Sequence, residues 1–208
     1  MEIKDIFPTP VGFGYNKDTV SMIDEHQYLI DLPYEHHSEY NMVISKNKFI
    51  LTSSPIVNIQ KFINAQLQEY AKKTLGTSQP LKITQSWCTK HENTLESTFP
   101  HTHQNSIISG VYYVNATKES EGLTFHKNTD YNDRYVTWQT DDKLMKEHYW
   151  NWRWCKFPVE TGLLILFPSQ LKHSVEGEYN NNLRCSLAFN TWFDGPIGNE
   201  NDLSLLNI

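Results

Sequence analysis

The stretch LKITQSWC, Leu81–Cys88, decides the class of fold, because the hydrophobic pattern changes its period there. Leu81, Ile83, Gln85 and Trp87 alternate with smaller or more polar residues, which is the two-residue repeat of a β-strand. Further strand candidates follow without a helical pattern between them: Ile107–Asn115, Leu123–Phe125, Tyr135–Thr140, Tyr149–Phe157, Leu163–Phe167 and Leu183–Trp192. Many short strands in succession predict a sandwich or jelly roll.

Upstream of this stretch the strongest signal is helical. Ser54 is a favourable N-cap, Pro55 suits the first helical position, and Gly76 is a favourable C-cap. The segment Phe7–Val11 contains two prolines and is expected to be extended, as an edge strand that wraps the domain. Residues 20–52 predict loops with short elements. The apolar residues that recur at helical spacing, and that we expect to pack on a sheet, are Ile56, Ile59, Ile63, Leu67 and Tyr70.

Composition is that of one folded domain in a reducing compartment. The chain has 208 residues, of which 13% are aromatic and 20% charged, which favours a packed core over disorder. The net charge of -6, without a basic block, argues against nucleic acid as a partner. Three cysteines without a C-x-x-C pair predict neither a disulfide framework nor a structural zinc site. We expect a single domain over 1–208, with an N-terminal part about 1–78 and a β core about 79–195, located in the cytoplasm and away from membranes.

The densest group of polar residues is PHTHQNS at 100–106, directly before an apolar strand. Alternation predicts that His101, His103 and Asn105 share one strand face. Two imidazoles at i and i+2 can converge on one transition metal ion, although such a pair alone is more often incidental. His173 follows a later strand and its turn, so it is a third candidate ligand, and a loop histidine packed on an aromatic ring is the alternative.

The strand Leu183–Trp192 contains a charged residue among apolar ones. Arg184, Ser186 and Asn190 share one face of this strand, and Cys185, Leu187 and Phe189 share the other. If the first face points inward, Arg184 is buried and binds a carboxylate, with Ser186 adding a hydrogen bond. If the more apolar face points inward, Arg184 meets solvent. The residues alone leave both orientations open.

Along the chain, an H-x-H pair is followed by a distal histidine and then by R-x-S. This order of motifs resembles that of the Fe(II)- and 2-oxoglutarate-dependent oxygenase superfamily. Five further motifs are similar to a branch of it that is found in marine phages and bacteria. They are Phe7–Pro10, Gln85–Trp87, Ser109–Tyr113, Phe167–Ser169 and Ser186–Asn190. The resemblance therefore extends over nearly the whole chain. It implies a double-stranded β-helix, the jelly-roll fold shared with cupins, carrying an N-terminal helical elaboration.

The resemblance also implies the site and the reaction. Fe(II) would be bound by His101 and His173, with His103 as third ligand or close neighbour, and Arg184 with Ser186 would bind 2-oxoglutarate. The side chains expected to surround this site are Tyr112, Tyr113, Asn105 and Asn190. The reaction would use O2 to hydroxylate an unactivated C–H bond of an amino-acid residue or a small metabolite.

One position departs from the commonest pattern of the superfamily. His103 occupies the place where H-x-D or H-x-E supplies a carboxylate. The motif also resembles that of the aspartyl/asparaginyl β-hydroxylases, which retain the first histidine and lack the carboxylate. A two-histidine site completed by water and a three-histidine site therefore both remain open.

Two other functions fit a jelly roll with histidines. The first is a cupin-like metal dioxygenase or isomerase that needs no 2-oxoglutarate, which an inward Arg184 would argue against. The second is a binding module without catalysis that recognises a peptide or saccharide through its tryptophans. The substrate could be a small molecule or a peptidyl residue, and a homodimer is an open possibility.

Three further features of the sequence are weaker signals. His126 ends a strand and is expected to be exposed rather than a ligand. Trp150, Trp152 and Trp154 alternate along a strand candidate, and we expect this aromatic face to belong to the core. Residues 127–142 are acidic and polar and are expected to form a long loop over the mouth of the barrel.

Overall fold

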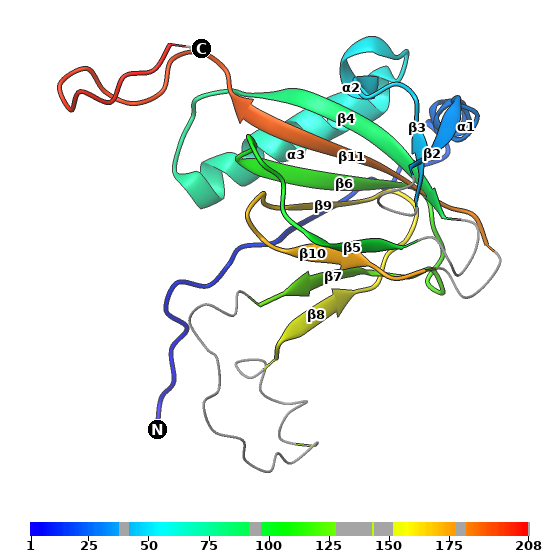
Figure 1. The fold of residues 1–208 in the computed structure, drawn as a ribbon, viewed down its shortest axis with the longest axis horizontal. Coiled ribbons are helices and arrows are strands. Elements are labelled where there is room, and N and C mark those ends of the chain that lie inside the picture. Colours follow the sequence, from blue (N-terminus) through cyan, green and yellow to red (C-terminus); the bar gives the residue numbers. More distant parts are fainter. Residues whose placement is uncertain (38–41, 92–96, 128–142, 144–151, 178–181, 208) are drawn as a thin grey trace.

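The protein is described here from a computed structural model that covers residues 1–37, 42–91, 97–127, 143, 152–177 and 182–207. Its strands form two antiparallel sheets that face each other (Figure 1). The larger sheet has the order β1 (Gly12–Tyr15), β9 (Leu163–Pro168), β6 (Ile108–Asn115), β11 (Arg184–Phe193), β4 (Leu81–His91), β3 (Met42–Ser45) and β2 (Tyr34–His37). The smaller sheet has the order β5 (Thr98–His101), β10 (His173–Val175), β7 (Leu123–His126) and β8 (Trp154–Phe157). This arrangement confirms the predicted jelly roll.

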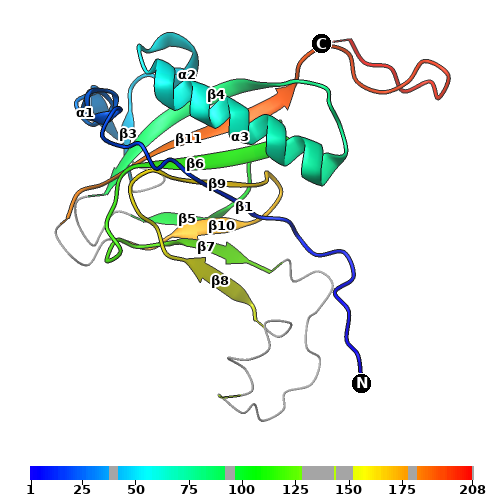
Figure 2. The ribbon, with the colours of Figure 1, turned by 180° about the vertical axis from the view of Figure 1, so that it is seen from behind.

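The helices cover the outer face of the larger sheet (Figure 2). They are α1 (Ile23–Ile30), α2 (Ile50–Ser53) and α3 (Val57–Leu75). The predicted apolar stripe of α3 is buried, from Ile59 to Tyr70, and packs on β4 and β9. Gly76 has φ 65°, the left-handed conformation that the C-cap prediction required.

The start of α3 differs from the prediction. Ser54 is extended, and the N-cap residue is Ile56, which has no side-chain capping bond. Glu25 of α1 supplies the cap instead. Its carboxylate accepts the backbone N–H groups of Asn58 at 3.0 Å and Ile59 at 2.9 Å. A negative charge at a helix N-terminus satisfies the free N–H groups and interacts favourably with the helix dipole, so a local N-cap is not needed.

Most predicted strands are present in the structure, but several segments differ from the prediction. Of the strand expected over Tyr149–Phe157, residues 149–151 lie outside the described residues, and β8 begins at Trp154. The strand expected over Tyr135–Thr140 also lies outside the described residues. The two prolines of the N-terminal segment precede the edge strand β1, which begins at Gly12. Strands β5 and β10 were not predicted, because with 4 and 3 residues they are too short and too polar to show a period.

Both faces of the larger sheet are buried. On the outer face, Cys185, Leu187 and Phe189 of β11 pack into the cluster that includes the stripe of α3. On the inner face, Ile165 and Phe167 of β9 pack against apolar residues of the smaller sheet. The space between the sheets therefore contains the next strand residues in the alternation, including Arg184 and Ser186.

Candidate active site

Three histidines meet between the sheets. His101 ends β5, His173 begins β10, and the two residues are paired across the smaller sheet. His103 lies two residues beyond the end of β5. The three ring centres are 4.4 to 5.0 Å apart, and one ring nitrogen of each histidine lies within 4.8 Å of the others. The structure therefore brings together the three histidines that the sequence analysis selected.

His103 is positioned by a loop and not by strand alternation, so that part of the prediction was wrong. Its backbone N–H donates to the carbonyl of Ser169 at 3.0 Å. The ring of Trp87 on β4 lies 5.8 Å from its ring, centre to centre. Asn105 has φ 53° in a turn, so the chain leaves the strand direction that alternation had assumed.

Hydrogen bonds to backbone carbonyls fix the ring orientation of two of the imidazoles and the nitrogen that carries the proton. His101 Nδ1 lies 2.7 Å from the carbonyl oxygen of Phe99, and His173 Nδ1 lies 2.9 Å from that of Leu171. A carbonyl can only accept, so Nδ1 carries a proton in both rings, and Nε2 is the nitrogen left to bind a metal ion. In metal sites, a hydrogen bond from the ring nitrogen that does not bind the metal orients the histidine in this way.

The spacing and charge of the cluster suit a transition metal ion. His103 Nε2 and His173 Nε2 are 3.2 Å apart. Two nitrogens bound to one ion at about 2.1 Å, with an angle of about 100° between them, would be separated by about 3.2 Å. Burial, together with the nearby His101, lowers the pKa of His103 to about 4 and that of His173 to about 3. Both rings are therefore neutral at pH 7, and three imidazoles are a donor set that fits iron.

Within the described ranges of the chain, no carboxylate joins this cluster of three histidines. His103 therefore lies where the commonest superfamily pattern would place the acidic ligand. The described residues of the cluster therefore bring no negative charge to a metal ion. An ion bound there would keep its full positive charge, which favours anionic ligands at the remaining coordination positions.

Arg184 lies further inside the same pocket. It is 1% exposed, which excludes the orientation in which its side chain meets solvent. Nη1 lies 3.2 Å from Nδ1 of His91, and Nη2 donates to the hydroxyl of Tyr113 at 3.5 Å. Burial and Arg184 lower the pKa of His91 to about 3, and burial raises the pKa of Tyr113. Both groups are neutral at pH 7.

Ser186 is the next inward residue on β11. Its hydroxyl lies 3.0 Å from that of Thr89, the residue opposite it on β4. Arg184 and His91 form the neighbouring cross-strand pair. The pocket therefore has histidines on the smaller sheet and a row of polar residues on the larger one.

The structure does not bring all the expected residues into this pocket. Tyr112 lies on the outer face of its strand, where its hydroxyl is 2.9 Å from Nε2 of His26 on α1. Asn105 and Asn190 line a separate cleft at the edge of the site. Tyr113 does line the Arg184 end through its hydroxyl.

Sequence reasoning missed His91 and Thr89, which line the pocket beside Arg184 and Ser186. Two-residue steps from Trp87 lead to both residues, so part of the signal was present, although Leu81 and Ile83 pack on the outer face because the register with β11 shifts between Ile83 and Gln85. What the sequence lacked was the register of β4 against β11, which alone places His91 opposite Arg184.

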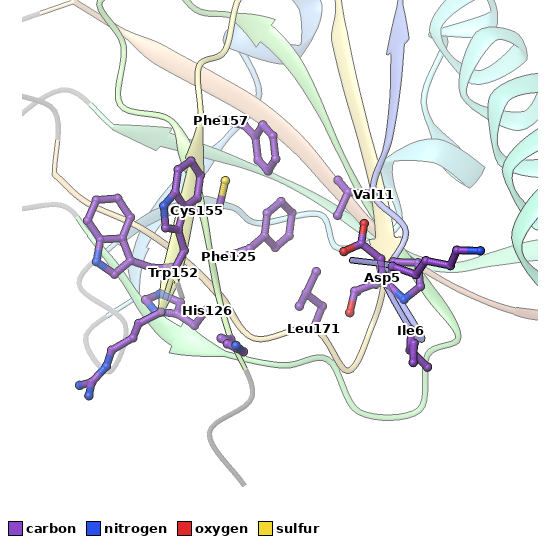
Figure 3. Close-up of a pocket in the computed structure, with 15 residues that line it drawn as sticks. Asp5, Ile6, Val11, Phe125, His126, Trp152, Cys155, Phe157 and Leu171 are labelled. Carbon is purple, nitrogen blue, oxygen red and sulfur yellow. The ribbon is translucent and has the colours of Figure 1, made fainter. Parts of the chain in front are cut away.

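A second and larger cavity, of about 680 Å³, lies between the N-terminal segment and strands β7 and β8 (Figure 3). Trp152 and Trp154 line it with exposed fractions of 38% and 60%, so the prediction that this aromatic face belongs to the core was wrong for these two. Trp150 lies outside the described residues. His126 also lines this cavity, and its Nε2 lies 2.8 Å from the hydroxyl of Ser174.

No helix in the described parts of the chain combines the length and the apolar character needed to cross a membrane.

The fold and the site together define a class of protein. A jelly roll with a histidine cluster and a buried arginine in one pocket is the arrangement of non-haem iron oxygenases that use 2-oxoglutarate. Residues 85–190, about half of the chain, match the family described as "Putative 2OG-Fe(II) oxygenase", and the chain belongs to this family. It is accordingly a 2-oxoglutarate-dependent non-haem iron oxygenase, with Fe(II), 2-oxoglutarate and O2 as the reactants of its class.

Solved structures share the fold at low sequence identity. The non-haem α-ketoglutarate-dependent epimerase SnoN from nogalamycin biosynthesis is 12% identical, with a TM-score of 0.62 over 90% of this chain and 80% of SnoN. An oxidoreductase of the 2OG-Fe(II) oxygenase family from Burkholderia pseudomallei is 12% identical, with a TM-score of 0.57 over 87% of this chain and 84% of its own. HygX from Streptomyces hygroscopicus, solved with nickel and 2-oxoglutarate, is 10% identical, with a TM-score of 0.57 over 88% and 82%. A comparison with curated proteins found no match.

Proposed function

We propose that this protein hydroxylates an unactivated C–H bond of a small metabolite or an amino-acid residue, as a single domain over residues 1–208. In this proposal His101, His103 and His173 bind Fe(II), and Arg184 binds 2-oxoglutarate. The observation that carries the proposal is that the imidazole cluster and the buried guanidinium line the same pocket. Bound iron and 2-oxoglutarate would activate O2, with one oxygen atom entering the C–H bond and the other entering succinate as CO2 leaves.

The end of the pocket that contains Arg184 suits the distal carboxylate of 2-oxoglutarate. The guanidinium is buried, and a carboxylate would accept charge-assisted hydrogen bonds from it in a fixed geometry. The hydroxyls of Ser186 and Thr89 lie one step along the strands and could donate to the same ligand. Anchoring this end orients the 2-oxo acid end toward the histidines.

His91 offers a further donor to the same carboxylate. A guanidinium only donates, so His91 Nδ1 accepts from Arg184 and the imidazole proton is on Nε2. That nitrogen is buried, and among the described residues it has no hydrogen-bond partner. A buried donor without a partner is unfavourable by about 1–3 kcal/mol, and a carboxylate oxygen would satisfy it. His91 therefore serves in this proposal as a binding residue for the cosubstrate.

The apolar lining of the pocket has its own role. Leu123, Phe167 and Val175 from both sheets surround the histidines and exclude water from one side of the cluster. Exclusion of water strengthens the electrostatic contacts inside the pocket and limits side reactions. HygX has also been solved with hygromycin B bound, which supports a small molecule rather than a peptide as the substrate here.

Thermal unfolding under nitrogen tests the proposal. Mn(II) at about 100 times its Kd should stabilise the protein by about 2.7 kcal/mol, and 2-oxoglutarate should add a similar increment only when the metal is present. Each increment corresponds to a rise in Tm of about 5–10 °C for a chain of this size. Succinate, which lacks the 2-oxo group, is the matched control ligand.

The outcomes separate the alternatives. Stabilisation by Mn(II) without any further effect of 2-oxoglutarate would support a cupin-like enzyme, and the absence of both effects would support a binding module. His101→Ala and His173→Ala should each abolish the effect of the metal. Once the metal and cosubstrate are shown to bind, formation of succinate in air would establish turnover.

A further inference from the structure

Four carboxamide side chains converge on one cleft that neither the metal centre nor the cosubstrate pocket uses. Gln85 of β4, Gln104 and Asn105 of the loop after β5, and Asn190 of β11 line this carboxamide cleft, which has a volume of about 600 Å³. All four belong to motifs of the sequence analysis that the proposed iron and 2-oxoglutarate contacts leave without a role. The remaining lining residues are Phe49, Lys82, Thr84 and Trp192.

The cleft begins where the iron site ends. On β11 the row that contains Arg184 and Ser186 continues to Asn190, which is paired with Gln85 of β4. Gln85 precedes Trp87 by two residues on the same strand face, a step of about 7 Å. Trp87 contacts His103, and Gln104 is the next residue after His103. A molecule in the cleft would therefore lie against the metal-binding loop.

Hydrogen bonds fix the direction in which Asn190 can bind. The hydroxyl of Ser109 donates to its Oδ1 at 3.0 Å, which leaves the Nδ2 donors for a ligand. Ser109 is also 2.8 Å from the hydroxyl of Ser169, whose carbonyl holds the backbone of His103. The cleft and the metal loop thus share one buried hydroxyl network, which makes the position of one depend on the other.

The chemistry of the cleft is neutral. Lys82 is the one charged residue among the described residues that line it, and its ammonium is 3.7 Å from the carboxylate of Asp194. Phe49 is 52% exposed, and the buried Nε1 of Trp192 leaves only ring carbon to face a ligand. Carboxamides donate and accept at adjacent atoms, which suits hydroxyl groups that also do both, while aromatic carbon suits the C–H face of a sugar ring.

We propose that the carboxamide cleft binds the substrate of the oxygenase reaction and that this substrate is a neutral, polyhydroxylated ring compound with the chemistry of a saccharide. The proposal rests on the proposed function. The larger cavity beside Trp152 is a poorer candidate for a neutral polyhydroxylated ligand, because its described lining includes charged residues and no carboxamide side chain. The charged residues are Lys4, Asp5, Lys127 and Arg153.

The test is binding of neutral saccharides, with maltotriose, chitotriose and trehalose as probes, to protein loaded with Mn(II) and 2-oxoglutarate under nitrogen. Saturation-transfer NMR should detect at least one probe, and the double variant Gln85→Ala/Gln104→Ala should weaken it at least about tenfold, since two neutral hydrogen bonds are lost. The matched control is Gln27→Ala, an exposed carboxamide on α1, which should bind the probe as the wild type does.

Three results would overturn the proposal. They are failure of all three probes to bind, preference for a capped neutral peptide or a sugar phosphate, and unchanged binding in the double variant. Stabilisation of the wild-type protein by Mn(II) and 2-oxoglutarate is recorded in the same samples. If it is present while the saccharides fail, the substrate assignment is wrong and the oxygenase assignment stands. If it is absent, the proposed function itself fails.

Discussion

Replacement of Arg184 by methionine should weaken 2-oxoglutarate strongly while the metal remains bound. Arg184 is 1% exposed, so methionine retains much of the buried volume and removes only the donors and the charge. A hydrogen bond to a charged group contributes about 1.5–3 kcal/mol, which corresponds to an increase in Kd of about 10- to 150-fold. The guanidinium of Arg184 can form two such bonds with one carboxylate, so this range is a lower bound on the increase in Kd.

The folded protein should tolerate this change. Removal of a buried guanidinium relieves its desolvation cost, which favours the folded state of the variant. The change also leaves His91 Nδ1 and the Tyr113 hydroxyl without their donor, at a cost of about 1 kcal/mol each. These effects oppose each other, so Tm without ligands should shift by only a few degrees.

Isothermal titration of 2-oxoglutarate into Mn(II)-loaded protein under nitrogen measures the effect. Arg153→Met is the matched control, because Arg153 lines the larger cavity near Trp152 and not the pocket of Arg184. An unchanged Kd for 2-oxoglutarate in Arg184→Met, with normal metal content, would refute the assignment of this residue to the carboxylate. Loss of metal together with 2-oxoglutarate would mean that the substitution disturbs the whole site.

Four further predictions follow from particular contacts. His91→Phe should raise the Kd for 2-oxoglutarate about tenfold in the same titration, through loss of the Nε2 donor, and an unchanged value would place Nε2 away from the cosubstrate. His103→Ala should lower iron affinity about 10- to 100-fold or more in metal analysis, whereas full iron content with slow turnover would indicate a two-histidine centre. Glu25→Ala should lower the free energy of unfolding by about 1 kcal/mol in urea, because it removes the carboxylate that caps α3, and no change would show the cap to be dispensable. Gly110→Ala should cost about 1–3 kcal/mol, since the added Cβ would lie 2.2 Å from Cζ of Phe189, and the double variant with Phe189→Leu should recover part of that loss.

The short strands show why part of the fold could not be predicted. β4, β6, β9 and β11 have 6 to 11 residues each, long enough for their patterns to show in the sequence. β5 and β10 have 4 and 3 residues, and they form because neighbouring strands offer backbone partners. Trp152 and Trp154 were predicted to be in the core and are exposed. The prediction failed because an alternating aromatic pattern does not reveal whether another layer covers it.

The sequence by itself determined the change from a helical to a strand period at Leu81, the apolar stripe of α3, and the three histidines and one arginine on which the site depends. Only the tertiary structure decided how they meet. His101 and His173 are adjacent because β5 and β10 pair in a register that local pattern does not encode. Arg184 points inward because α3 and its neighbours cover the apolar face of β11, so that the helices and not the strand choose which face lines the pocket.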